Sequence, residues 1–284
     1  MSCCTPKSNR GDQAKNDQYR QNIRDAYTKV AQADDSDQGC CVDSSCCVEP
    51  DDITINTLIS KRMGYSDDEL NDVPAGADMG LGCGNPRAIA SLRAGEVVVD
   101  LGAGGGFDCF LSAREVGKTG YVIGVDMTPD MVTKARGNAE KGKYSNVEFR
   151  LGEIEHLPIA DSKADVVISN CVINLSPDKP QVFREAFRVL KPGGRLAISD
   201  VVATVELPNE LRSDVALVAG CMGNASLIED LETMIKEAGF TDVRIEPKDE
   251  SKTFMRDWTP DRKVLDYVVS ATIEGTKSAN DSCC

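Results

Sequence analysis

The sequence is short of positive charge and of long hydrophobic runs. Its 284 residues include 32 Lys and Arg against 46 Asp and Glu, which gives a formal net charge of −14. Nucleic-acid binding requires clustered Lys and Arg, so this class of function is disfavoured. No apolar run approaches the roughly 18 residues that span a membrane, and residues 1–21 contain no hydrophobic signal segment. We therefore expect a cytoplasmic protein that binds neither nucleic acid nor membranes.

The sequence also has almost no histidine and lacks the cysteine spacing of a zinc finger. His156 is the only histidine, and because a metal site needs several ligands we expect it at the surface. No C-x-x-C pair repeats at zinc-ribbon spacing, and only the run of Cys41, Cys46 and Cys47 comes near it. The sequence therefore gives weak support for a structural zinc site.

Cysteine itself is abundant. Eight of the 12 cysteines form adjacent pairs, and Cys83, Cys109, Cys171 and Cys221 are single. Cytoplasmic thiols are kept reduced, so unusual cysteine content there needs a chemical explanation. Cys171 follows a β-branched run, at the end of an expected strand where α/β proteins bind ligands. It is either a small core side chain or a reactive thiol, and its position alone leaves both open.

The chain divides into three expected regions. Residues 1–50 are polar, and we expect a flexible, cysteine-rich tail with one helix near residues 17–32 and no share in the core. Residues 51–203 form the main domain. Residues 204–284 follow with helical stretches and two further strands, which either complete the sheet or form a small appended unit.

From Glu96 onward, β-branched runs alternate with helical segments. The pattern predicts strands at 96–102, 121–126, 147–152, 164–170 and 194–202, and helices at 107–117, 129–141 and 179–190. Residues 191–194 predict a turn before the last of these strands. Buried strands joined by helices indicate a parallel sheet covered on both faces. We therefore predict an α/β fold with a doubly wound, mainly parallel, Rossmann-like sheet.

A glycine-rich turn follows the first expected strand. It reads Asp100-Leu-Gly102-Ala-Gly104-Gly-Gly106 and opens a helix. Glycines let the backbone turn tightly and approach a ligand, and a helix N-terminus offers unpaired N–H groups. Phe107 replaces the third glycine of the dinucleotide fingerprint, which argues against NAD.

Further ligand contacts are expected after the second and third strands. Asp126 ends the second strand, where its carboxylate either accepts hydrogen bonds from a ribose or caps the next helix. Met127 packs either on an adenine face or in the core. After the third strand, the Glu153 side chain or the Ile154 backbone amide can contact an adenine edge.

Together with "VLKPGGRL" before the fifth strand, these features resemble the class I S-adenosylmethionine-dependent methyltransferases. The resemblance implies that Gly102 and Gly104 line the cofactor, that Asp100 supports its methionine end and that Asp126 holds its ribose hydroxyls. It also adds Asn170, at the end of the fourth strand, to the cofactor residues.

Three cysteine contexts narrow this resemblance. The segments "GLGCGNP", "SNCVINLSPDK" and "AGCMGNA" closely resemble the arsenite methyltransferases, over roughly residues 60–275. In that family cysteines in these contexts bind trivalent arsenic, and they correspond to Cys83, Cys171 and Cys221, the last within the C-terminal region. Arsenic(III) is soft and thiophilic. Its lone pair can attack a sulfonium methyl group directly, so the lack of a nearby histidine as general base is expected.

The same resemblance implies thiol–disulfide chemistry between an N-terminal cysteine and Cys83. Cys40 and Cys41 lie nearest to that context, with Cys46 and Cys47 as rivals. It further implies a small trivalent arsenical as substrate and a thiol reductant of the glutathione or thioredoxin type. We expect Cys109 in the core and the enzyme to be a monomer.

Two alternative functions stay open at this point. A methyltransferase of a small organic acceptor would share the sheet without depending on the three thiols. A thiol-based metalloid-sequestering protein would bind arsenic without turnover, although the intact motif at Asp100, Gly102, Gly104 and Asp126 argues against it.

Overall fold

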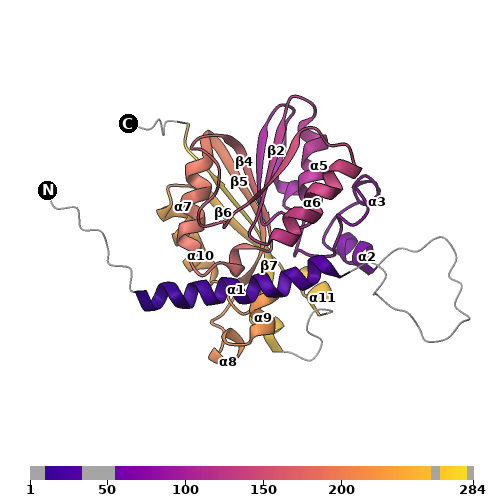
Figure 1. The fold of residues 1–284 in the computed structure, drawn as a ribbon. Helices are drawn as coiled ribbons and strands as arrows, with labels where there is room; N and C mark the ends of the chain where they lie inside the picture. Colours follow the sequence, from indigo (N-terminus) through magenta and orange to yellow (C-terminus); the bar gives the residue numbers. More distant parts are fainter. Residues whose placement is uncertain (1–9, 34–54, 257–262, 280–284) are drawn as a thin grey trace, which may run out of the picture.

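One seven-stranded sheet runs through the molecule, in the order β3-β2-β1-β4-β5-β7-β6 (Figure 1). The computed structural model describes residues 10–33, 55–256 and 263–279. The strands are β1 (Val97–Leu101), β2 (Tyr121–Asp126), β3 (Val147–Leu151), β4 (Ala164–Asn170), β5 (Leu190–Ala203), β6 (Thr241–Lys248) and β7 (Val268–Thr276). The first five are parallel, whereas β7 runs antiparallel to both β5 and β6. The predicted doubly wound, mainly parallel sheet is confirmed, and the two C-terminal strands complete it.

Helices cover both faces of this sheet (Figure 1). They are α1 (Arg10–Gln32), α2 (Ile55–Arg62), α3 (Asp67–Asn71), α4 (Arg87–Ala90), α5 (Phe107–Val116), α6 (Pro129–Lys141), α7 (Lys179–Val189), α8 (Asn209–Arg212), α9 (Val215–Ala219), α10 (Ile228–Glu237) and α11 (Lys252–Met255), with 3-10 turns η1 (Ile173–Leu175), η2 (Asp249–Ser251) and η3 (Lys263–Asp266). Val98 belongs to a hydrophobic cluster that includes buried side chains of α5 and α6, whereas Val99 belongs to the cluster that includes α7 and α10. Successive side chains of a strand point to opposite faces, so β1 is buried on both.

The segment 191–194 differs from its prediction. We expected a turn there, but these residues belong to β5, as a bulge between the pairs Ala164–Leu190 and Val166–Arg195. The reason is a second set of hydrogen bonds. Lys277 accepts from the N–H of residue 193 at 2.8 Å and donates to the carbonyl of residue 194 at 2.9 Å. The chain leaving β7 thus pairs with the bulge, in which Gly193 has φ 79°.

Helix α1 also departs from expectation. It extends beyond the predicted range 17–32 and lies across the carboxyl ends of the parallel strands (Figure 1). Ile23 is only 2% exposed and packs in the hydrophobic cluster that contains the single cysteines 83, 171 and 221. The prediction that residues 1–50 take no part in the core is therefore wrong for this helix.

The physical reason is a stripe of large side chains that the polar composition hides. Tyr19, Ile23 and Tyr27 recur at every fourth residue, which places them on one helical face. All three pack in the cluster at the carboxyl end of the sheet. This stripe gives an otherwise polar helix an apolar face that packs on the domain.

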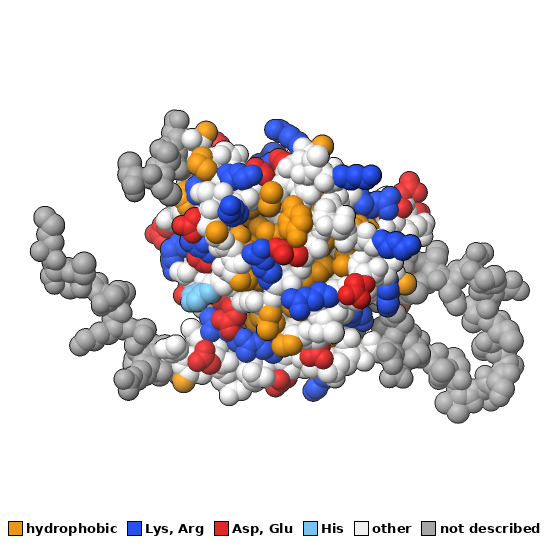
Figure 2. Space-filling model, turned by 45° about the horizontal axis from the view of Figure 1, so that its top comes forward, with side chains coloured by type: hydrophobic (Ala, Val, Ile, Leu, Met, Phe, Trp, Pro, Cys, Tyr) orange, Lys and Arg blue, Asp and Glu red, His pale blue; other side chains and the backbone are white. Residues whose placement is uncertain are grey.

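The surface agrees with the low positive charge. On the face drawn in Figure 2, Lys and Arg are interspersed with Asp and Glu, and the two signs are not gathered into separate patches. His156 is exposed, as expected. Within the described ranges, no helix has both the length and the apolar character needed to cross a membrane.

Candidate functional site

A cavity of about 560 Å³ opens at the carboxyl ends of β1, β2 and β4. Ligands of open α/β sheets bind at this edge, because the connecting loops diverge there. The cavity is lined by seven of the eight expected cofactor residues: Asp100, Gly102, Gly104, Asp126, Met127, Ile154 and Asn170. They come from four segments of the chain, and the strand order β3-β2-β1-β4 brings them together.

The glycine loop is shaped for close approach. Gly102 has φ 71°, and a Cβ there would lie 2.4 Å from the side chain of Val172, so any larger residue would clash. The N–H groups of Gly104 and Thr128 donate to the two carboxylate oxygens of Asp126, at 3.0 and 2.8 Å. Asp126 therefore both faces the cavity and ties the loop after β1 to the end of β2.

Asp100 is the buried acidic residue just before the glycine loop. It is 3% exposed, and the thiol of Cys109 donates to its Oδ2 at 3.1 Å. Burial, followed by the nearby Asp108 carboxylate, raises the pKa of Asp100 well above its ordinary value. Cys109 is fully buried, as we expected.

The eighth expected residue, Glu153, does not line the cavity. Arg24 of α1 lies 2.6 Å from its carboxylate, and this ion pair holds the side chain against the helix. Its neighbour Glu155 lines the cavity instead, 3% exposed and 3.2 Å from the Arg20 guanidinium. Of the two alternatives for an adenine contact, the Glu153 side chain therefore lies outside the cavity lining, whereas Ile154 lines the cavity.

The sequence predictions missed the wall that α1 contributes. Arg20, Ile23 and Tyr27 all line the cavity. The Tyr27 hydroxyl donates to the carbonyl of Ala219 at 3.3 Å and lies beside the Cys221 thiol. The spacing of four residues between Ile23 and Tyr27 was a signal that could have located this face.

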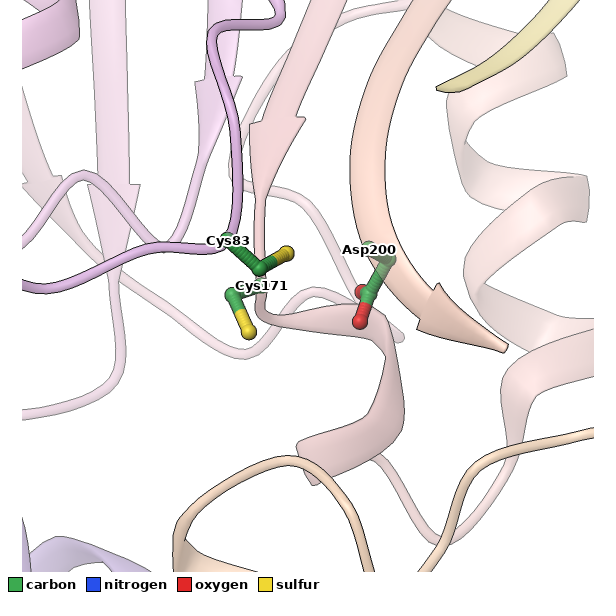
Figure 3. A group of neighbouring side chains, drawn as sticks. All are labelled: Cys83, Cys171 and Asp200. Carbon is green, nitrogen blue, oxygen red and sulfur yellow. The ribbon is translucent and has the colours of Figure 1, made fainter. Parts of the chain in front are cut away.

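Three single thiols converge beside the cavity. Cys83 lies in the loop before α4, Cys171 directly after β4 and Cys221 after α9, and all three are buried. The sulfur atoms of Cys83 and Cys171 lie within 4.8 Å of each other and of the Asp200 carboxylate (Figure 3). The Cys221 thiol donates to the carbonyl oxygen of Cys171 at 2.6 Å. Cys171 and Cys221 line the cavity, while Cys83 lies behind residue 82.

Two of these cysteines have an uncommon backbone. Cys171 has φ 58° and Cys221 has φ 63°, in the left-handed region that residues other than glycine seldom adopt. The Cys171 N–H donates to the Ser199 carbonyl at 2.8 Å, and the Cys221 N–H donates to the Val218 carbonyl at 3.1 Å. Such conformations persist where the surrounding structure holds them, often at functional sites.

The surroundings of the thiols favour their protonated forms. Burial raises the pKa of Cys83. For Cys221, the hydrogen bond with Cys171 and then burial raise the pKa well above its ordinary value. These thiols therefore stay protonated at neutral pH and lose their protons when they bind a thiophilic centre.

Two buried charged residues, Asp200 and Lys179, lie near the thiols, and no sequence motif pointed to either. Burial raises the pKa of Asp200 to about 6, although N–H groups of Ile173 and Val201 donate to it at 2.9 and 2.7 Å. Burial lowers the pKa of Lys179 to about 8. Its ammonium donates to Ser226 Oγ at 2.7 Å. The thiol site thus sits over two buried charged groups.

The predicted tail cysteines cannot be placed in this site. Cys40 and Cys41, like Cys46 and Cys47, lie outside the described residues. Their part in thiol–disulfide chemistry stays a prediction.

The chain is similar to known proteins in both sequence and fold. A family model described as a methyltransferase domain matches residues 92–239. The chain is 50% identical over 273 residues to the arsenite methyltransferase of Halobacterium salinarum, covering 93% of this chain and 68% of that protein. It is 43% identical over 157 residues to the human arsenite methyltransferase, covering 52% of this chain and 42% of the human protein.

A solved structure of an arsenic methyltransferase is also similar to this chain. It is CrArsM, an arsenic(III) S-adenosylmethionine methyltransferase from Chlamydomonas reinhardtii, with TM-score 0.56 and 34% identity. The similarity covers 78% of this chain and 73% of that one. The chain is thus a methyltransferase, and the expected resemblance is confirmed. With half of its residues identical to those of the Halobacterium enzyme over nearly its whole length, the chain belongs to the arsenite methyltransferase family.

Proposed function

We propose that this enzyme transfers a methyl group from S-adenosylmethionine to trivalent arsenic held by Cys83, Cys171 and Cys221. The observation that carries the proposal is the convergence of three buried thiols, two of which line a cavity that the glycine loop also lines. Neither feature alone specifies the reaction. Together they put a thiophilic site and a nucleotide-type site within one cavity.

The cavity fits the cofactor. Its volume of about 560 Å³ lies within the usual range of roughly 300–1,000 Å³ for small-molecule sites. A Cβ on Gly104 would meet no heavy atom within 4 Å, so the backbone there faces open space that a ligand can fill. We infer that Asp126 receives the ribose hydroxyls, that Met127 and Ile154 contact the adenine, and that Asp100 supports the methionine end. Bound S-adenosylmethionine supplies an electrophilic methyl group on a sulfonium centre.

The three cysteines suit arsenic because each thiol replaces one hydroxyl. Arsenous acid and three thiols give three arsenic–sulfur bonds and three molecules of water. Thiolates are soft ligands and match a soft centre. A three-coordinate arsenic keeps its lone pair, which is then free to face the methyl donor.

No group has to take a proton from the nucleophile. A lone pair on arsenic carries none, so the absence of histidine from this site agrees with the proposal. What the protein supplies is alignment, which can contribute about 7–11 kcal/mol in favourable systems. The left-handed backbone at Cys171 and Cys221 supports a site built for fixed geometry.

Methyl transfer to the lone pair formally oxidises arsenic from +3 to +5. Two thiolates can return the two electrons by forming a disulfide, which an external thiol of the glutathione or thioredoxin type then reduces. We infer that Cys40 or Cys41 takes part in this exchange with Cys83. The proposal therefore needs residues 204–284 for Cys221 and residues 1–50 for the exchange.

Mass spectrometry of the reaction tests the proposal. Purified enzyme with arsenite, S-adenosylmethionine and a thiol is expected to give methylated arsenicals, with one S-adenosylhomocysteine for each methyl group transferred. A matched reaction without arsenite gives the background of cofactor turnover. Tight arsenite binding without either product would instead favour a sequestering protein. Cofactor turnover with an organic acceptor alone would favour the other alternative.

A further inference from the structure

Cys83 differs from the other two thiols because no helix or strand ends beside it, whereas Cys171 directly follows β4 and Cys221 closely follows α9. It follows Gly82 and precedes Gly84 in a segment that is neither helix nor strand. A backbone between two glycines has more freedom to move than any other, so something else must fix the position of this sulfur.

Side chains from two strands supply that constraint. Asn170, the last residue of β4, accepts a hydrogen bond from the Cys83 N–H through Oδ1 at 2.9 Å. Ser270 of β7 donates from Oγ to the Cys83 carbonyl oxygen at 2.6 Å. Both backbone polar groups of Cys83 are therefore held by the sheet.

The amide nitrogen of Asn170 adds a further link between β4 and the loop of Cys83. Its Nδ2 donates to the Gly84 carbonyl at 2.8 Å, and it also lies 3.1 Å from the Tyr65 hydroxyl and 3.2 Å from Asp108 Oδ2. We expected Asn170 to bind the cofactor. It does line the cavity, but both ends of its amide are bonded to protein groups.

The loop also lies in direct contact with the strand ends. A Cβ on Gly82, whose φ is 132°, would lie 2.8 Å from the Asn170 amide nitrogen. A Cβ on Gly84 would lie 2.9 Å from Ser199 Oγ of β5. The two glycines let the chain approach closely enough for the hydrogen bonds at Cys83 to form.

We propose that Asn170 and Ser270 are positioning residues that hold the Cys83 sulfur in place for trivalent arsenic with three exchangeable ligands. This inference rests on the proposed function. Arsenite has three labile hydroxyls and uses all three thiols. A monomethylated trivalent arsenical has two, which Cys171 and Cys221 can replace without Cys83. Loss of the constraint is therefore expected to weaken arsenite binding selectively.

Equilibrium binding to two single variants tests this. Asn170→Ala removes the acceptor for the Cys83 N–H, and Ser270→Ala removes the donor to its carbonyl. Each variant is expected to bind arsenite about tenfold more weakly, the change that roughly 1.4 kcal/mol produces. Binding of the monomethylated arsenical, measured by dialysis and arsenic quantification, is expected to change less than about twofold.

Ser112→Ala provides a matched control. Ser112 is fully buried, and within the described residues its hydroxyl has no hydrogen-bond partner, so the substitution is of the same kind without touching Cys83. Ser270 is also buried and does not line the cavity. Ser270→Ala should therefore keep the wild-type affinity for S-adenosylmethionine, which calorimetric titration measures.

The outcomes separate this inference from the proposed function. Cys83→Ser is measured in the same assay. If Cys83→Ser weakens arsenite binding but Asn170→Ala and Ser270→Ala do not, the positioning role is overturned and the three-thiolate site stands. Equal losses for both arsenicals, or a loss equal to that of Ser112→Ala, also overturn it. Unchanged arsenite binding by Cys83→Ser would overturn the proposed function and this inference with it.

Discussion

The two ends of the cavity are built in different ways. At the glycine loop, the lining comes from residues 102–105 and from the Asp126 carboxylate at the end of the next strand, only 24 positions after Gly102. At the thiol site, side chains converge from three segments near residues 83, 171 and 221. The first site is therefore mostly local in sequence, whereas the second depends on the assembled fold.

The two ends also differ in what lies behind them. The glycine loop is tied to the end of β2 by the hydrogen bond from the Gly104 N–H to Asp126. At the thiol site, hydrogen bonds from β4 and β7 hold the loop of Cys83, and the buried Asp200 carboxylate lies within 4.8 Å of the Cys83 and Cys171 sulfur atoms. A site made of soft side chains needs rigid support, because no ladder of backbone hydrogen bonds orients a sulfur atom. The comparison predicts that each end can be damaged without the other.

The largest effect is expected from Cys171→Ser. A serine hydroxyl stays protonated and is a hard ligand, so methylation of arsenite should fall by more than about a hundredfold, above the usual effect of removing a group that merely orients a ligand. S-adenosylmethionine affinity should be retained. Product formation by mass spectrometry measures the first, and calorimetry the second. Cys109→Ser is the control, since Cys109 contacts Asp100 and not the thiols. Full activity of Cys171→Ser would remove the thiol site from the mechanism.

The next effect concerns pH and the buried lysine. The pKa of Lys179 falls from 10.5 to about 8 on folding, because burial disfavours the ammonium. Between these values the unfolded chain binds more protons, so the free energy of unfolding should rise with pH, by up to about 3 kcal/mol. This contribution is lost as the pH falls through 8. Lys179→Met should not show this rise in the free energy of unfolding. Denaturant unfolding of the wild type and the variant at pH 8 and 10.5 measures the difference. Parallel pH dependence in the two proteins would contradict it.

The cofactor end is tested by Asp126→Ala. Loss of hydrogen bonds from the ribose and from the Gly104 N–H should weaken S-adenosylmethionine binding by about 1–3 kcal/mol. Arsenite binding to the same variant should stay close to wild type, because the carboxylate touches none of the three thiols. Titration with each ligand separately measures both. An unchanged cofactor affinity would show that the ribose is held elsewhere.

The smallest effect is expected from the tail cysteines. Deleting residues 1–50 would also remove α1, which lines the cavity, so substitution is the cleaner test. Cys40→Ser with Cys41→Ser should lower turnover of saturating arsenite by less than about tenfold, and turnover of a monomethylated arsenical by less, because an external thiol can replace a tethered one. Cys46→Ser with Cys47→Ser is the matched control. An equal loss for both substrates would rule out the redox role.

The core of the fold was predictable because its signals are local. The bounds of β2, β4 and α6 match their predicted ranges residue for residue. The errors occur where distant parts of the chain intervene. Arg24 of α1 turns Glu153 away from the cavity, and the segment after β7 converts the predicted turn at 191–194 into a bulge. Neither the Arg24–Glu153 ion pair nor the pairing of residues 191–194 with the segment after β7 can be predicted from the local sequence.

Sequence by itself determined the parallel sheet, the glycine loop with its acidic partner, and the identity of the three cysteines with a special context. The sheet and the loop follow from β-branched runs, glycine and spacing, which act over a few residues, whereas the three cysteines were identified by the resemblance of their sequence contexts to the arsenite methyltransferases. Only the tertiary structure decided that α1 lines the cavity, that Asp200 lies beside Cys83 and Cys171, and that Asn170 accepts a hydrogen bond from the Cys83 N–H. Those features depend on which side chains meet after the sheet has formed, because burial and hydrogen bonding between distant segments have no counterpart in local sequence. Cys171 shows both levels: its position at the end of a strand is local, while its burial against two other thiols is tertiary.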